Sequence, residues 1–79
     1  MDMEIFEQVK KVVAEQFRIS EDEITAETNF TENLNADSLD IVEMTMSLEA
    51  VYDLGELEDE ALENLRTVGD VVNLIASKQ

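Results

Sequence analysis

Ser38 is the residue with the most evident potential for chemistry, because it lies between two aspartates in the stretch NADSLDIVEM, residues 35–44. A serine nucleophile needs a neighbouring base to take its proton. The chain has no histidine and no cysteine, and position 41 is isoleucine where a Ser-x-x-Lys pair would need lysine. Asp37 and Asp40 would also disfavour an oxyanion at the hydroxyl. The sequence therefore predicts no catalytic residue and no enzyme activity.

A calcium loop is the second chemistry that the spacing suggests. Asn33, Asn35 and Asp37 alternate along the chain as the first ligands of an EF-hand do. The sixth position of such a loop requires glycine and the twelfth a bidentate glutamate. Here these positions hold Ser38 and Met44. We therefore expect no specific metal site, only loose binding of divalent cations to the acidic surface.

Two interpretations of Ser38 then remain: a helix-start residue without chemistry, or a site that another enzyme modifies. A hydroxyl in the first turn of a helix is exposed, and the N-terminal amides and positive dipole end favour an attached phosphate. The neighbouring carboxylates repel a phosphate, so they need another use, such as docking a basic modifying enzyme. The residues alone leave both interpretations open.

The charge of the chain is strongly segregated. The formal net charge is −15, and residues 19–65 hold 15 acidic residues and no base. Such a surface disfavours nucleic acid and anionic membrane and favours basic protein partners. The alternative is that the charge only keeps a small protein soluble. No apolar run is long enough to span a membrane, and the N-terminus carries acids where a signal peptide carries bases. We expect a cytoplasmic monomer.

Apolar residues at helical spacing predict most of the elements. They indicate a helix over residues 3–17, and SEDE (20–23) predicts a capping box that starts one short turn. Residues 25–36 are rich in threonine and asparagine and predict a long loop, with Phe30 and Leu34 as anchors into the core. Asp37 is a good N-cap for a helix that runs from Ser38 to about Tyr52.

The C-terminal part predicts two further helices. A short acidic helical piece with Leu57, Leu62 and Leu65 follows a break at Gly55. Thr67 caps the last helix, whose buried stripe is Val68, Val71, Val72 and Ile75. No alternating run is long enough for a strand. The expected fold is all-α and a single domain over residues 1–79: a small bundle of three main helices plus one short helix, with a long loop after the first helix.

The helix after Ser38 has two apolar stripes where one would suffice for burial. The first comprises Ile41, Met44, Leu48 and Tyr52, and the second comprises Leu39, Val42, Met46 and Ala50. The second stripe widens the core face or stays partly exposed and contacts a partner. Methionine and a charged rim both suit an interface. Periodicity does not distinguish these two possibilities.

The stretch NFTENLNADSLDIVEMTMSLE resembles the modification-site segment of acyl carrier proteins, and ADSLD is most similar to the fatty-acid-synthesis type. The resemblance extends over essentially the whole chain. It includes the opening VKKVVAEQF, the EDEIT turn and the closing TVGDVVNLIASK. It carries the same expectation of a helical bundle.

The resemblance implies that Ser38 receives 4′-phosphopantetheine from coenzyme A through a holo-carrier synthase. Acyl intermediates would then travel as thioesters on this arm between the enzymes of fatty acid biosynthesis, so the sulfur belongs to the cofactor. Basic patches on those enzymes would bind a recognition surface made of Asp37, Leu39, Asp40, Val42, Glu43, Met46 and Glu49. Acyl chains would fold back between the helices, with Phe30, Ile41, Met44, Leu48, Leu65 and Ile75 as lining candidates.

The chain departs from the family pattern at three places. Asn35 stands where glycine is usual, and Ala50 stands where a glutamate is frequent. The segment between Tyr52 and Thr67 is one residue longer, so the second recognition loop would fall on Glu56, Leu57 and Glu58. Two alternative functions are a specialised carrier for polyketide, lipid A-type or D-alanine pathways, and an unmodified acidic adaptor that binds a basic enzyme.

Overall fold

The computed structural model describes residues 1–55 and 59–79, and that part of the chain contains helices and no strand. The main helices are α1 (Met3–Phe17), α2 (Ser38–Tyr52) and α4 (Val68–Lys78). Two shorter pieces are the 3-10 turn η1 (Glu21–Glu23) and α3 (Asp59–Glu63). The predicted all-α bundle of three main helices, one short helix and a long first loop is confirmed.

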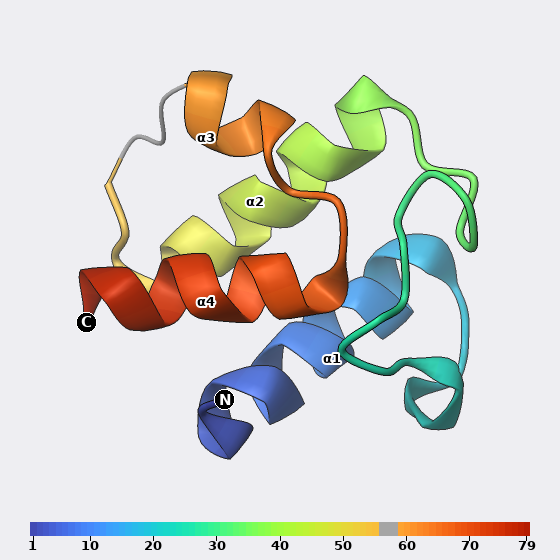
Figure 1. Ribbon diagram of the computed structural model, residues 1–79, viewed down its shortest axis with the longest axis horizontal. Coiled ribbons are helices and arrows are strands. Elements are labelled where there is room, and N and C mark those ends of the chain that lie inside the picture. Colours follow the sequence, from blue (N-terminus) through green and yellow to red (C-terminus); the bar gives the residue numbers. More distant parts are fainter. Residues whose placement is uncertain (56–58) are drawn as a thin grey trace.

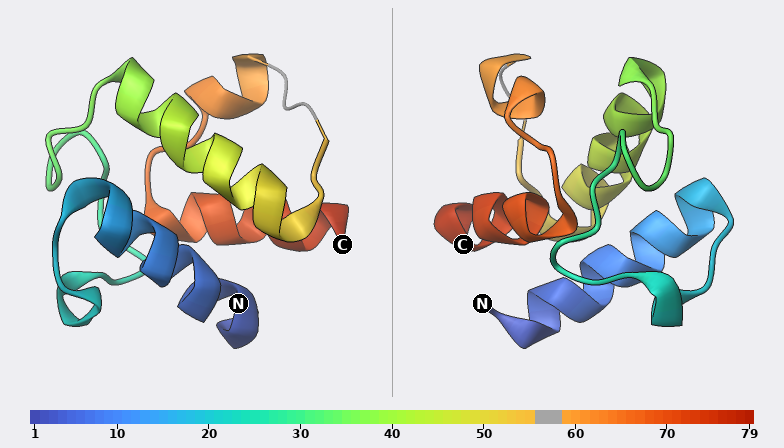
Figure 2. Two further views of the ribbon diagram at one scale, coloured as in Figure 1. Left: turned by 180° about the vertical axis from the view of Figure 1, so that it is seen from behind. Right: turned by 45° about the vertical axis from the view of Figure 1, so that its right-hand side comes forward.

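The helices α1 and α2 pack side by side in opposite directions (Figures 1 and 2). Near the C-terminal end of α1, the Gln16 side-chain amide donates to the Glu43 carboxylate at 2.9 Å. At the other end, burial raises the pKa of Tyr52 on α2, and the carboxylates of Asp2 and Glu4 at the start of α1 add to the effect. The helix α4 also packs against α1, so α1 contacts both other main helices.

Local sequence explains where each main helix begins. The Asp2 carboxylate accepts hydrogen bonds from the first amides of α1. Asp37 and Asp40 form a capping box at α2, in which each carboxylate accepts the other residue's backbone N–H, at 2.9 and 3.1 Å. Thr67 and Asp70 form the same box at α4. These bonds satisfy amides that have no partner within the helix.

The expected capping box at residues 20–23 is wrong in detail. The Ser20 hydroxyl accepts from the N–H of Asp22 at 3.2 Å rather than from Glu23. The Glu23 N–H instead donates to the Ser20 carbonyl at 3.0 Å. This tighter bonding makes a 3-10 turn, in which the Glu23 N–H that the box would use is already bonded to the Ser20 carbonyl.

The loop between α1 and α2 docks on the N-terminal end of α4 (Figure 1). The first amides of α4, from Val68 and Gly69, donate to the carbonyls of Thr28 and Ala26 at 3.0 and 2.8 Å. Just before α4 begins, the Arg66 carbonyl accepts a hydrogen bond from the Phe30 N–H of the loop at 2.9 Å. These bonds fix the loop against the segment that connects α3 to α4.

A single apolar cluster joins all the main helices. Its buried members are Ile5, Val9, Val13, Ile24, Phe30, Met44, Leu48, Leu65, Val68, Val71, Val72 and Ile75. Phe30 is fully buried and stacks on Phe17 with ring centroids 6.2 Å apart, and Leu34 packs against the cluster, so both predicted loop anchors are confirmed. The predicted α4 stripe is buried as expected. Leu57 lies outside the described residues.

Candidate functional site

Ser38 is the first residue of α2 and is exposed. The capping box on either side of it fixes the helix start, so the hydroxyl is held at the positive end of the helix dipole. Asn35, three residues before it, has a left-handed backbone with a φ of 54°. Asparagine tolerates this conformation, which explains how it can replace the glycine that the family pattern prefers.

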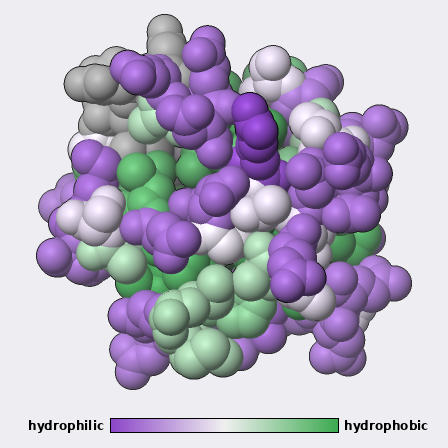
Figure 3. All heavy atoms as spheres, viewed as in Figure 1, coloured by the Kyte–Doolittle hydropathy of each residue, from purple (hydrophilic) through white to green (hydrophobic). Residues whose placement is uncertain are grey.

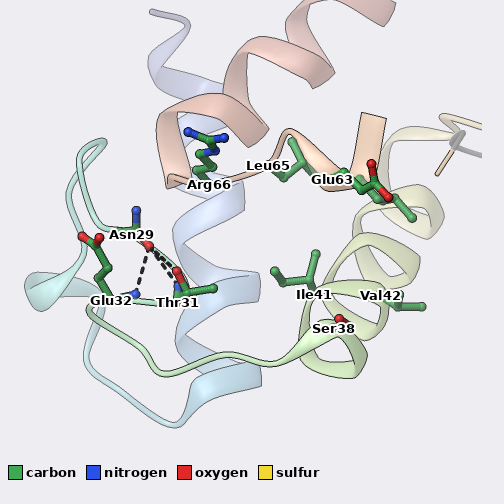
Figure 4. Close-up of a pocket in the computed structure, with 10 residues that line it drawn as sticks. Asn29, Thr31, Glu32, Ser38, Ile41, Val42, Glu63, Leu65 and Arg66 are labelled. Atoms are coloured by element: carbon green, nitrogen blue, oxygen red, sulfur yellow. Dashed lines mark hydrogen bonds between the residues drawn. The ribbon is translucent and has the colours of Figure 1, made fainter. Parts of the chain in front are cut away.

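A cavity of about 650 Å³ opens beside Ser38, between α2, α3 and the docked loop (Figure 4). Ser38 and Val42 stand at one end of it, and Asn29, Thr31, Glu32 and Arg66 gather at the other (Figure 4). Apolar side chains lie between these ends. The lining residues are Asn29, Thr31, Glu32, Ser38, Ile41, Val42, Leu62, Glu63, Leu65 and Arg66.

Two of the six residues expected to line an acyl pocket, Ile41 and Leu65, line this cavity. The other four are Phe30, Met44, Leu48 and Ile75, and they lie in the closed core with at most 1% of their surface exposed. A chain entering from the cavity would have to separate α2 from its neighbours to reach them. The structure therefore brings together the outer part of the expected pocket only.

The polar end of the cavity was not expected from the sequence. The Asn29 side-chain oxygen accepts from the N–H groups of Thr31 and Glu32, both at 3.0 Å, and forms a tight turn. That turn reaches the cavity only because the loop is docked on α4 through backbone bonds. The Asn-x-Thr spacing could have indicated the turn, but nothing in the side-chain pattern indicated where it would lie.

The second apolar stripe of α2 faces solvent. Leu39, Val42 and Met46 are 63%, 38% and 60% exposed, and Ala50 is exposed as well. The first stripe is the core face, with Met44 and Leu48 buried. The structure thus excludes a wider core face for Leu39, Val42 and Met46. Thr45, which the apolar pattern did not mark, is buried and donates its hydroxyl hydrogen bond to the Val42 carbonyl at 2.8 Å.

Three carboxylates around this exposed stripe also have a structural use. Asp37 and Asp40 cap α2, and Glu43 accepts from Gln16 of α1. In each case one of the two carboxylate oxygens makes the bond. Glu49 is partly exposed one turn beyond Met46. These contacts hold the acidic groups beside Leu39, Val42 and Met46 in a fixed arrangement, and the second oxygen of each engaged group can accept further bonds.

The acidic surface has few internal counter-charges. Within residues 1–55 and 59–79 the one ion pair joins Lys10 to Glu7 at 3.1 Å. Figure 3 shows hydrophilic residues over most of the face on which α4 lies. The described residues contain no group of three or more His, Cys, Asp or Glu side chains that could hold a metal ion. They also form no helix long and apolar enough to cross a membrane.

An exposed serine at a fixed helix start, beside a cavity with apolar and hydrogen-bonding walls, suits the attachment of a flexible group. The serine offers its hydroxyl, the helix end favours a phosphate, and the cavity beside it has both polar and apolar walls. This arrangement suits a carrier domain, in which the reactive chemistry resides on an attached group rather than on the protein's own side chains.

Comparison with known proteins identifies the carrier class. The family described as "Phosphopantetheine attachment site" matches residues 7–75. The acyl carrier protein of Petrotoga mobilis (strain DSM 10674 / SJ95) is 41% identical over 75 residues, which cover 95% of this chain and 87% of that protein. A solved structure, "Novel Structural Components Contribute to the High Thermal Stability of Acyl Carrier Protein from Enterococcus faecalis", has 34% identity and a TM-score of 0.80, covering 98% of this chain and 96% of the other.

The chain therefore belongs to the acyl carrier protein family. The group that this family carries is 4′-phosphopantetheine, and its members are carriers rather than enzymes. The second recognition loop expected at Glu56, Leu57 and Glu58 lies outside the described residues.

Proposed function

We propose that the chain carries acyl intermediates of fatty acid biosynthesis as thioesters on a 4′-phosphopantetheine arm attached to Ser38. The observation that supports this most directly is the position of Ser38: exposed, first in α2, and at the edge of the cavity. The arm supplies the thiol that a chain without cysteine lacks. We further propose that the protein works in the cytoplasm, where coenzyme A and the holo-carrier synthase would meet it.

The attachment is tested by incubating the protein with coenzyme A and a holo-carrier synthase and measuring its intact mass. We expect one added phosphopantetheinyl group in the wild type and none in Ser38→Ala. Ser47→Ala is the matched control, because Ser47 is an exposed serine on the same helix. An unmodified wild type beside a carrier that is modified under the same conditions would contradict the proposal.

The pathway is tested separately. The holo protein is supplied with fatty acid elongation enzymes, and the acyl groups on the arm are identified by mass. Accumulation of long acyl chains supports the fatty acid pathway. A loaded arm that these enzymes do not extend would instead indicate a specialised carrier, such as one for polyketide, lipid A-type or D-alanine chemistry.

The recognition surface is proposed to be the exposed stripe of α2 and its carboxylates: Asp37, Leu39, Asp40, Val42, Glu43, Met46 and Glu49. Its apolar centre is solvent-exposed in the isolated chain. Burial of this surface against a partner would stabilise the complex by about 25 cal/mol for each Å² of apolar area removed from water. The carboxylate rim would increase the association rate with basic enzymes at low salt. Together these features suit repeated, reversible docking.

We predict that Met46→Ala raises the KM of the holo-carrier synthase by about tenfold, the effect of losing one central interface contact. Met3→Ala is the control, because Met3 is similarly exposed, at 59%, but lies on α1. Steady-state kinetics of arm attachment measure both variants. Equal KM values for Met46→Ala and Met3→Ala would place the docking surface elsewhere.

A further inference from the structure

Arg66 is the only basic residue between residues 19 and 77, and it lies in the wall of the cavity that Ser38 borders. Its backbone is fixed on both sides. The N–H donates to the Asp70 carboxylate at 3.0 Å, and the carbonyl accepts from the Phe30 N–H at 2.9 Å. The residue itself is exposed. The backbone thus holds a long cationic side chain at one fixed point of the cavity rim.

The guanidinium of Arg66 forms no ion pair within the part of the chain that the structure describes. Two acidic side chains, Glu32 and Glu63, line the same cavity. Across the part of the chain that the structure describes, neither forms an ion pair with Arg66. Among the described residues the Arg66 side chain makes no hydrogen bond or ion pair, and a guanidinium offers five N–H donors and no acceptor to a group that enters the cavity.

Ser38 and Arg66 stand at opposite ends of the cavity, and Ile41 and Leu65 lie between them (Figure 4). A chain that starts at the Ser38 oxygen and follows the cavity therefore passes apolar side chains first and meets Arg66 with its far part. The far part of a phosphopantetheine arm consists of amide units and ends in the thiol or thioester. Its carbonyl oxygens are the acceptors that a planar, multi-donor guanidinium binds well.

We propose that Arg66 is a positioning residue for the arm: it donates hydrogen bonds to carbonyl oxygens in the far part of the arm and holds the arm along the cavity. This inference rests on the proposed attachment at Ser38. Arg66 takes no part in attaching the arm, which an external enzyme performs. Its effect is on where the arm lies between encounters with partner enzymes.

The test is a comparison of the apo and holo proteins by ¹H–¹⁵N NMR. The chain has two arginines, Arg18 and Arg66, so the arginine Nε–H signals are readily assigned. We expect attachment of the arm to shift the Nε–H signal of Arg66 and the backbone amides of Asn29 and Thr31, and to leave the signal of Arg18 unchanged. In Arg66→Ala, the shifts at Asn29 and Thr31 should fall to less than half of their wild-type size.

Lys11→Ala is the matched control, because it removes the same charge from an exposed position on α1 outside the cavity. It should leave the holo-minus-apo shifts at the wild-type size. An Arg66 signal that does not move on attachment, or amide shifts that are the same in Arg66→Ala and wild type, would overturn the assignment. Failure of the synthase to add the arm would instead overturn the proposed attachment at Ser38, and the mass measurement separates these outcomes.

Discussion

At the scale of single residues, the proposed role of Ser38 depends on the position of its hydroxyl and not on a catalytic group beside it. The hydroxyl is exposed at the start of α2, where the Asp37–Asp40 box fixes the backbone on both sides of it. The left-handed Asn35 turns the preceding loop toward this start. Asp37, Asp40 and Asn35 thus set the backbone geometry around the hydroxyl.

The backbone at Asn35 leads to a stability prediction. A residue with a Cβ costs about 1–2 kcal/mol in the left-handed region, less for asparagine and nothing for glycine. We therefore expect Asn35→Ala to lower the free energy of unfolding by about 1 kcal/mol, and Asn35→Gly to change it by less than about 0.5 kcal/mol. Urea denaturation measures both. Equal losses in the two variants would mean that an asparagine side-chain contact, rather than the backbone angle, is important here.

At the scale of elements, the docking of the first loop on α4 builds the polar end of the cavity. The close approach occurs at Gly69, where an added Cβ would lie 3.0 Å from the Ala26 carbonyl oxygen. That same oxygen accepts the Gly69 N–H at 2.8 Å, so it cannot move away without stretching the bond. The loop therefore depends on a glycine in the first turn of the helix.

We predict that Gly69→Ala destabilises the protein, although alanine is intrinsically the better helix former by about 1 kcal/mol. The displaced Ala26 carbonyl and the weakened hydrogen bond should outweigh that gain by about 1 kcal/mol. Asn73→Ala is the control, since Asn73 is exposed on the same helix and benefits from alanine without a clash. Thermal unfolding of both variants checks this. A higher melting temperature for Gly69→Ala would mean that the Ala26 carbonyl can move away from the new Cβ at little cost in free energy.

The elements also show what the sequence could and could not predict. Asp37 and Thr67 are local signals, and so the starts of α2 and α4 were predicted to the residue. Ser38 was singled out because it lies in a recognisable segment, and its role in attachment stays a prediction. The cavity wall at Asn29 and Arg66 was not predicted, because the contacts that bring these residues together are backbone hydrogen bonds between distant segments. Such bonds leave no pattern in the side chains.

At the scale of the whole molecule, an acidic surface surrounds a small apolar core. The chain carries a net charge of −15 yet has a radius of gyration of 11.2 Å, close to the roughly 12 Å of an ordinary domain of this length. The core therefore overcomes a repulsion that the described residues offset with one ion pair. The same uncompensated negative charge on the surface would attract basic partners.

We predict that the melting temperature rises with added salt, because exposed charges are screened within about 8 Å at physiological ionic strength. Each kcal/mol of relieved repulsion should raise it by about 4–8 °C in a domain of this size. Millimolar magnesium should raise it more than sodium chloride at equal ionic strength. Calorimetry across both series measures this, and a flat response to both salts would show that the carboxylates are not under mutual repulsion.

The proposed function depends on Ser38 carrying the arm, and the mass of the protein purified from its natural cells tests this most directly. Intact mass spectrometry followed by fragmentation locates any attached group. We predict a phosphopantetheinyl group, with or without an acyl cargo, on Ser38. The same group found on Ser20, Ser47 or Ser77, or a protein that is never modified, would contradict it.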